Sequence, residues 1–142
     1  MKIRDIIETD LEELSKLYYQ FWGEESDVEK MKNQLQLIKN ENNHIILVCE
    51  NKGIIVGSVM GIVCRELYGD CSPFLVIENM IVDKQHRKQG IGTMLLEALE
   101  RNARARNCTQ MILVTEINRI DACIFYESLG FSKDTTGYKK KL

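Results

Sequence analysis

The chain has 142 residues, of which 44% are hydrophobic and 28% charged, a mixture typical of one globular domain. Its formal net charge of -2 gives no general reason to expect nucleic-acid binding. The five cysteines contain no C-x-x-C pair, so we expect free thiols, no metal site and a cytoplasmic location. The longest apolar run, residues 53–64, is interrupted by glycine, so we expect no membrane span. We also expect no signal peptide.

The first half of the chain predicts two helices followed by a β-hairpin. Residues 2–6 are typical of a short strand, and residues 9–22 of a helix that Thr9 or Asp10 can cap. The S-x-x-E pattern of Ser26 and Glu29 predicts the start of a second helix. Residues 44–50 and 53–64 are β-rich runs, which Asn-Lys-Gly at 51–53 would join as a turn. Apolar side chains recur at helical spacing in the first helix: Leu11, Leu14, Leu17, Tyr18, Phe21 and Trp22.

The second half alternates predicted strands and helices. Strands are expected at residues 73–83, 110–116 and 131–142, the last as a strand or hairpin. Helices are expected from about Gly90 to Arg106 and at residues 120–129, where Gly130 would end the second one. This order predicts a mixed α/β sheet that is antiparallel early, with a strand–helix–strand crossover in the second half.

Two basic residues and two glycines precede the longer of these helices: Arg87, Lys88, Gly90 and Gly92. A helix N-terminus exposes unpaired N–H groups and a partial positive charge, so it stabilises an anion such as a phosphate. A P-loop is excluded because Thr93, not lysine, follows the second glycine, and a dinucleotide fingerprint because Leu95 stands where a third glycine is needed. The glycine spacing alone fits a plain tight turn equally well, and the basic pair favours a phosphate cradle.

Three segments together resemble the GNAT superfamily of acyl-CoA N-acyltransferases. The family signature [QR]-x-x-G-x-[GA] stands at residues 87–92 as RKQGIG, residues 77–86 (IENMIVDKQH) look like the family's fourth strand, and residues 125–131 (FYESLGF) look like its last-helix motif. The resemblance covers nearly the whole chain. It implies one GNAT domain at residues 1–142, with a mixed, mostly antiparallel sheet, a splayed fourth and fifth strand, and about four flanking helices.

The same resemblance implies acetyl-CoA as the donor and a primary amine as the acceptor, which attacks directly in a ternary complex. Backbone N–H groups of the turn would hold the pyrophosphate, and the exposed edge of the fourth strand would pair with the pantetheine arm and polarise the thioester carbonyl. The family often has Asn seven residues before its tyrosine, where this chain has Arg119 and Asn118 stands one residue earlier. The residues expected to bind the cofactor are Met80, Ile81, Val82, Arg87, Lys88, Gln89, Gly90, Ile91, Gly92, Thr93, Asn118 and Tyr126.

Acetyl transfer needs two proton movements: the acceptor ammonium loses a proton before attack, and the departing thiolate receives one. Two residues are candidates for these roles. Tyr126 matches the family's tyrosine and would protonate or hydrogen-bond the departing thiolate, or else it only packs beside Phe125. Glu78 is the candidate base, because burial in an apolar strand, whose residues 76, 78 and 80 should share a face, would raise its carboxyl pKa. Alternatively, Glu78 faces solvent or pairs with a cation, and water removes the proton.

Aromatic and acidic residues in segments 18–29 and 65–74 suit a cationic acceptor. The residues expected to bind it are Trp22, Glu24, Tyr68 and Glu78. Residues 21–26 and 77–82 are also similar, more weakly, to the aminoglycoside 6′-N-acetyltransferase branch, which points to a polyamine, an aminosugar or a similar small amine. A protein N-terminal or lysine acetyltransferase, and a regulatory module that binds acyl-CoA without turnover, are the alternatives. We expect no nucleic-acid or membrane partner, and a monomer or homodimer.

Overall fold

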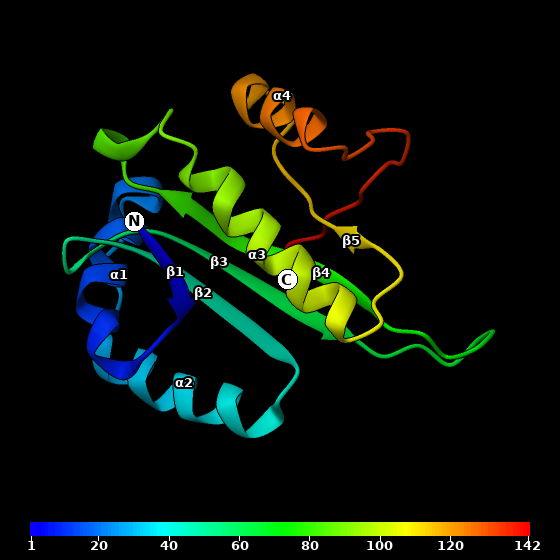
Figure 1. Ribbon diagram of the computed structural model, residues 1–142, viewed down its shortest axis with the longest axis horizontal. Coiled ribbons are helices and arrows are strands. Elements are labelled where there is room, and N and C mark those ends of the chain that lie inside the picture. Colours follow the sequence, from blue (N-terminus) through cyan, green and yellow to red (C-terminus); the bar gives the residue numbers. More distant parts are fainter. The chain divides into compact units, whose positions relative to one another are not determined.

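A five-stranded mixed sheet organises residues 1–112 of the computed structural model, which describes the whole chain, residues 1–142 (Figure 1). Each of the first four strands runs antiparallel to its neighbour, whereas the fifth is parallel to the fourth. The expected mixed, mostly antiparallel sheet is therefore confirmed. The strands follow one another in space as they do in sequence: β1 (Lys2–Asp5), β2 (His44–Asn51), β3 (Ile54–Cys64), β4 (Phe74–Val82) and β5 (Met111–Ile112).

Helices cover both faces of this sheet. Two of them, α1 (Leu11–Trp22) and α2 (Val28–Glu41), bury leucines in a core that includes Val48 and Ile81 of the strands. The third, α3 (Ile91–Ala105), links β4 to β5 and packs on the opposite face. There a Cβ on Gly61 would lie only 2.7 Å from Leu99 Cδ1, so a glycine lets helix and sheet approach closely. Single 3₁₀ turns, η1 (Glu8–Asp10) and η2 (Lys84–His86), precede α1 and α3.

The hairpin predicted at residues 51–53 is present. Asn51 pairs with Ile54, so Lys52 and Gly53 form a two-residue loop with φ angles of 50° and 82°. Two consecutive positive φ angles define a type I′ turn, whose twist matches that of the flanking strands.

Three local expectations are wrong. Asp27, not Ser26, caps α2: its Oδ1 accepts a hydrogen bond from Lys30 N at 3.0 Å, as an aspartate can do equally well. The strand expected at residues 110–116 pairs only at Met111–Ile112, and residues 131–142 form no strand. After Phe131 that segment has too few apolar residues to give a strand a buried face.

No helix is both long and apolar enough to cross a membrane.

Residues Leu113–Leu142 form a second compact unit. Its helix, α4 (Ile120–Ser128), begins where the sequence predicts and ends one residue early. Gly130 follows with a φ of 86° and donates its N–H to Glu127 O at 3.1 Å, as a residue that closes a helix does. The single domain expected over residues 1–142 stays a prediction.

Candidate active site

A β-bulge interrupts β4 in the segment that resembles the family's fourth strand. Glu78 pairs with Met60 and Ile81 with Ser58, so β4 crosses this stretch with one residue more than β3. Asn79 lies in the bulge with a φ of 51°, a left-handed conformation that asparagine adopts more readily than most residues. A bulge of this kind re-aims the side chains that follow it.

The segment Met80–Val82, expected to bind pantetheine, lies at an edge of the sheet. β5 pairs with β4 only at Leu75 and Val76, so Ile77–Val82 has no strand partner on that side. The Ile81 side chain is 4% exposed and packs in the core under α1 and α2, which leaves only its backbone available to a ligand. Residues 76, 78 and 80 do not share one face as expected, because the extra residue reverses the alternation before Met80 is reached.

The glycine turn leads directly into α3. Gly90 is the N-cap residue, with φ 78° and ψ 0°, a conformation that costs a residue with a side chain about 1–2 kcal/mol. No side chain caps the helix, and its first turn contains no acidic residue. The N–H groups of Ile91, Gly92 and Thr93 donate no hydrogen bond within the protein. An open helix N-terminus free of carboxylates fits the pyrophosphate of an acyl-CoA.

The basic residues of the turn are exposed to solvent, as a phosphate-binding role requires. Arg87 Nε donates a hydrogen bond to Val82 O at 3.3 Å, which ties the turn to the end of β4. Lys88 has a φ of 60°, so the chain reverses sharply here. Gln89 donates its side-chain amide to Gln85 O at 3.4 Å. These contacts hold the backbone of the turn in place before the helix begins.

A second set of contacts anchors the turn to α1. Asp83 contacts the ring of His86, and Lys84 N donates to Gln20 Oε1 at 3.3 Å. Burial alone would raise the pKa of Asp83, but hydrogen bonds with His86 and Gln20 lower that pKa below its usual value. His86 therefore has a structural partner.

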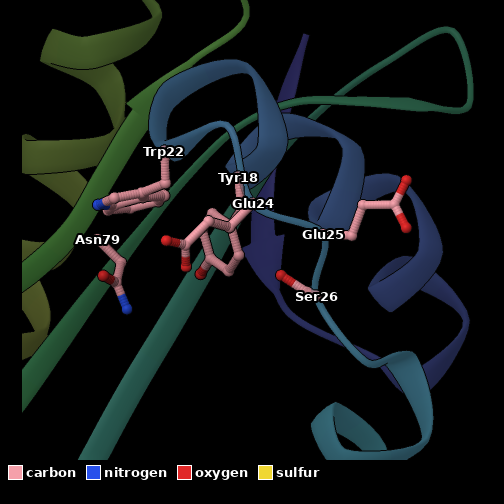
Figure 2. Close-up of a pocket in the computed structure, with 6 residues that line it drawn as sticks. All are labelled: Tyr18, Trp22, Glu24, Glu25, Ser26 and Asn79. Atoms are coloured by element: carbon pink, nitrogen blue, oxygen red, sulfur yellow. The ribbon is translucent and has the colours of Figure 1, made fainter.

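A cleft of about 250 Å³ opens beside the last turn of α1, the loop after it and the bulge of β4 (Figure 2). It brings together Trp22 and Glu24, which the sequence predicts to bind the acceptor. Figure 2 shows the Glu24 carboxylate on the side of Trp22 and Asn79, whereas Glu25 points away from them. An aromatic wall beside an unpaired carboxylate suits a cationic ligand. The six lining residues are Tyr18, Trp22, Glu24, Glu25, Ser26 and Asn79.

The aromatic wall is built from neighbouring residues of α1. The rings of Tyr18 and Trp22 meet edge to face with centroids 5.3 Å apart, and Phe21 contacts Trp22 at 4.6 Å. Burial raises the pKa of Tyr18 to about 12, and the nearby Ser58 hydroxyl opposes this only in part. The Tyr18 hydroxyl is therefore neutral at physiological pH. The Ser58 hydroxyl itself is buried and makes no hydrogen bond of ordinary geometry.

Glu78 and Tyr68, two other residues expected to bind the acceptor, do not line this cleft. Tyr68 lies between β3 and β4 and is 76% exposed. Glu78 is exposed as well, so the expectation that it is buried in the strand is wrong. Its cross-strand partner Met60 is only half-buried and does not belong to the core under α1 and α2.

Tyr126 and Asn118 belong to the unit Leu113–Leu142. The Tyr126 ring of α4 contacts the rings of Phe125 and Phe131, with centroids 5.3 and 5.8 Å away. Burial raises the pKa of Tyr126, against an opposing effect of Arg119. Its hydroxyl therefore stays protonated at neutral pH and can donate. Asn118 is exposed just before α4. The roles expected of both residues stay predictions.

Sequence reasoning missed Asn79. A usable signal was present: an asparagine in the middle of a Val/Ile-rich strand is out of place in a regular ladder, and asparagine is enriched at positive φ. That combination marks a candidate bulge. The sequence could not show that its side chain would reach the cleft.

Comparison with known families identifies the fold. The family model described as "Acetyltransferase (GNAT) family" matches residues 9–131. The chain belongs to the GNAT acetyltransferase family. This GNAT chain is 28% identical to the uncharacterized protein YdhI of Bacillus subtilis over 75 residues, which is 53% of the chain and 44% of YdhI. It covers less than half the length of the curated relatives that it matches.

Solved structures resemble the GNAT chain over nearly its full length. A protein of Agrobacterium tumefaciens superposes with a TM-score of 0.93 at 22% identity, covering 100% of both chains. A transcriptional regulator from Bacillus halodurans gives 0.90 at 28% identity, covering 99% of each. An aminoglycoside antibiotic 6′-N-acetyltransferase from Acinetobacter haemolyticus gives 0.78 at 20% identity, covering 100% of this chain and 99% of that one. At 20–22% identity the first and third likenesses establish the fold alone.

Proposed function

We propose that the chain is an acetyl-CoA-dependent N-acetyltransferase whose acceptor is the primary amine of a small cationic molecule, such as a polyamine, an aminosugar or an aminoglycoside-like compound. One observation carries the proposal: the unpaired edge of β4 runs through the turn into an uncapped helix N-terminus, all within residues 77–93. An acyl-CoA presents an amide-bearing arm and then a pyrophosphate, so this order of strand edge and helix end suits it.

The residues present fit that cofactor. The backbone of Met80–Val82 would pair with the pantetheine arm and polarise the thioester carbonyl. The N–H groups of Gly90–Thr93 would bind the pyrophosphate, with Arg87 and Lys88 adding charge from the solvent side. When bound, acetyl-CoA supplies an acetyl group activated as a thioester.

Two proton movements fall to the chain's own side chains. The acceptor ammonium must lose a proton before its nitrogen can attack the thioester carbonyl directly. Glu78 would accept that proton at its carboxylate, directly or through water, since it precedes the bulge and is open to solvent. Tyr126 would donate from its hydroxyl to the departing sulfur, because its raised pKa keeps the hydroxyl protonated.

The cleft supports a small acceptor. Its volume of about 250 Å³ is slightly below the roughly 300–1,000 Å³ typical of small-molecule sites, so it suits a small ligand. The Glu24 carboxylate makes no ion pair within the protein, so it can attract an ammonium. The face of Trp22 offers the same cation an aromatic surface. A peptide substrate would need a longer groove than these six residues provide.

A second candidate function rests on one comparison. The Bacillus halodurans structure, 28% identical over 99% of the chain, is described as a transcriptional regulator. A GNAT fold that binds an acyl-CoA without turning it over would fit that likeness. Transfer of the acetyl group to an amine distinguishes the two functions.

We also propose that residues 1–142 act as one catalytic domain. The family match at residues 9–131 runs through both compact units, and the expected cofactor residues fall in both. The odd number of cysteines, none in a disulfide, supports a reducing compartment such as the cytoplasm. A monomer or homodimer without a nucleic-acid or membrane partner fits the charge balance.

The experiment that tests the function is a thiol-release assay with acetyl-CoA. The acceptors are small amines, a peptide with a free N-terminus and a lysine-containing peptide with a blocked one. We expect amine-dependent release of CoA with small amines and little with either peptide. Release with the peptides alone would favour a protein acetyltransferase, and tight CoA binding without release would favour the regulatory module.

A further inference from the structure

Three hydrogen-bond donors of the cleft are unused. Asn79, Ser26 and Trp22 all line the cleft, and the amide, hydroxyl and indole N–H of their side chains donate no hydrogen bond within the protein. A ligand that displaces water from these groups must offer them acceptors, or it leaves donors unpaired. The Glu24 carboxylate lies on the side of Trp22 and Asn79 and needs a different partner, a cation or a hydrogen-bond donor (Figure 2).

Asn79 is the one of these three residues that lies on a strand. The register on both sides of the bulge is fixed, by the Glu78–Met60 pair before it and the Ile81–Ser58 pair after it. Its side chain is half-buried and lines the cleft. Its backbone, in contrast, belongs to β4, whose free edge we assign to acetyl-CoA. The Asn79 amide therefore lies where the cleft for the amine substrate meets the strand that would bind acetyl-CoA.

The acceptor classes that suit the proposed function differ in what they can offer these groups. A polyamine at neutral pH has only N–H donors, so it could donate to the Glu24 carboxylate, the Ser26 hydroxyl oxygen and the Asn79 carbonyl oxygen. It offers no acceptor to the N–H groups of Asn79 and Trp22. A hydroxyl group donates and accepts, so an amine with neighbouring hydroxyls could satisfy both the carboxylate and the donors. A site built to hydrogen-bond a hydroxyl discriminates strongly against the analogue that lacks it.

We propose that the acceptor is an amine with hydroxyl groups next to the reactive nitrogen, an amino sugar or amino alcohol rather than a linear polyamine, and that Asn79 selects it. The inference rests on the proposed function for its site. It adds the chemical class of the acceptor and the residue that distinguishes it. Glu24 holds the ammonium, Trp22 covers a face of the ligand, and the Asn79 amide donates to a hydroxyl oxygen.

Binding can be measured without any turnover. Trp22 is the only tryptophan of the chain and is 49% exposed in the cleft, so intrinsic fluorescence reports occupation of this site directly. The probes are D-glucosamine and cyclohexylamine, which share ring size and a single amine and differ in hydroxyl groups. Both are titrated at mildly acidic pH, where both amines are protonated.

The variant that isolates the amide is Asn79→Gly. Glycine adopts positive φ without strain, so the bulge is kept while the side chain is removed. Asn107→Gly is the matched control, because Asn107 also has a positive φ, 59°, but is exposed after α3, and its side chain makes no hydrogen bond.

The wild-type protein should bind D-glucosamine about 10-fold more tightly than cyclohexylamine, the effect of one or two good hydrogen bonds. Asn79→Gly should lose this preference by weakening D-glucosamine alone, and Asn107→Gly should keep it. Equal or tighter binding of cyclohexylamine, a preference that survives in Asn79→Gly, or no response to D-glucosamine would overturn the inference. Efficient acetylation of 1,4-diaminobutane with poor acetylation of D-glucosamine would also overturn it, while leaving the proposed function intact.

Discussion

Ile77 and Ile81 face opposite sides of the sheet although they lie four positions apart on one strand. Ile77 pairs with Gly61, on the face that α3 covers, whereas Ile81 pairs with Ser58 and lies in the core under α1 and α2. In a regular strand residues four apart share a face, so the bulge at Asn79 produces the difference. The stretch of β4 that has no neighbouring strand on one side therefore packs against α3 through Ile77 and into the core under α1 and α2 through Ile81.

The glycine turn gives a direct test of donor binding. Gly92→Trp should lower the affinity for acetyl-CoA at least ~10-fold, because a bulky side chain would obstruct approach to N–H groups whose bonds to a charged phosphate contribute about 1.5–3 kcal/mol each. Isothermal titration calorimetry measures the affinity, and circular dichroism checks the fold. Gly92→Ala, with one added methyl group, should lose less. Unchanged affinity in a folded Gly92→Trp protein would remove the turn from the cofactor site.

Tyr126→Phe should lower kcat by a factor of ~10²–10⁴ while acetyl-CoA binding changes little, since only the hydroxyl is removed. Steady-state kinetics at saturating substrates measure the effect. Tyr138→Phe is the matched control, because Tyr138 lies in the same unit and is 95% exposed. Equal kcat in Tyr126→Phe and the wild type would leave Tyr126 with a packing role beside Phe125 and Phe131.

Glu78→Gln separates the two roles open to this carboxylate. As the base, it should lower kcat and flatten the acidic limb of the pH–rate profile; as a binding group, it should mainly raise KM for the amine. We expect the first result, measured with a verified acceptor. Glu97→Gln on α3, also an exposed glutamate without an ion pair, is the control. If all three measurements match the wild type, water alone removes the proton.

Asp10 should make stability depend on acid pH. Arg4 Nη1 and Nη2 donate to its two carboxylate oxygens at 2.7 and 2.8 Å, and Ile7 N donates at 2.9 Å. Burial would raise the pKa of Asp10, but these hydrogen bonds lower that pKa overall. Because the folded-state pKa is the lower one, the stabilisation is complete above the unfolded-state value near 3.8 and is lost as the pH falls through the folded-state value.

Urea unfolding of Asp10→Asn checks this dependence. At neutral pH the variant should lose about 2 kcal/mol of unfolding free energy, because Arg4 loses a charged partner in a partly buried site. The difference from the wild type should shrink below the usual pKa range of aspartate. Asp27→Asn, an exposed cap that asparagine can replace, should change stability by no more than about 0.5 kcal/mol. A loss for Asp10→Asn that stays constant with pH would mean that the charge does not contribute.

Local patterns predicted much of the fold. The helical spacing of Leu11, Leu14 and Leu17 identified α1, the turn residues 51–53 identified the hairpin, and the apolar stripe after Gly90 identified α3. These signals lie within a few residues of the structure that they determine, so sequence alone carries them. The parallel pairing of β4 and β5 followed from the crossover between them.

The details of the site depend on residues distant in sequence. The exposure of Glu78 is set by how far the core under α1 and α2 extends over the sheet, which no local pattern records. Asn79 reaches the cleft only because β3 fixes the position of the bulge. The prediction of a strand at residues 131–142 is wrong for a local reason, because charged and small polar residues dominate that segment.

The central claim, acetyl transfer to an amine, is tested most directly by mass spectrometry of the acceptor after incubation with acetyl-CoA and the wild-type protein. The account predicts one N-acetylated amine for each CoA released, with formation of both abolished or strongly reduced in Gly92→Trp. CoA binding without any acetylated amine across the acceptor panel would contradict it and would make the chain a binding module.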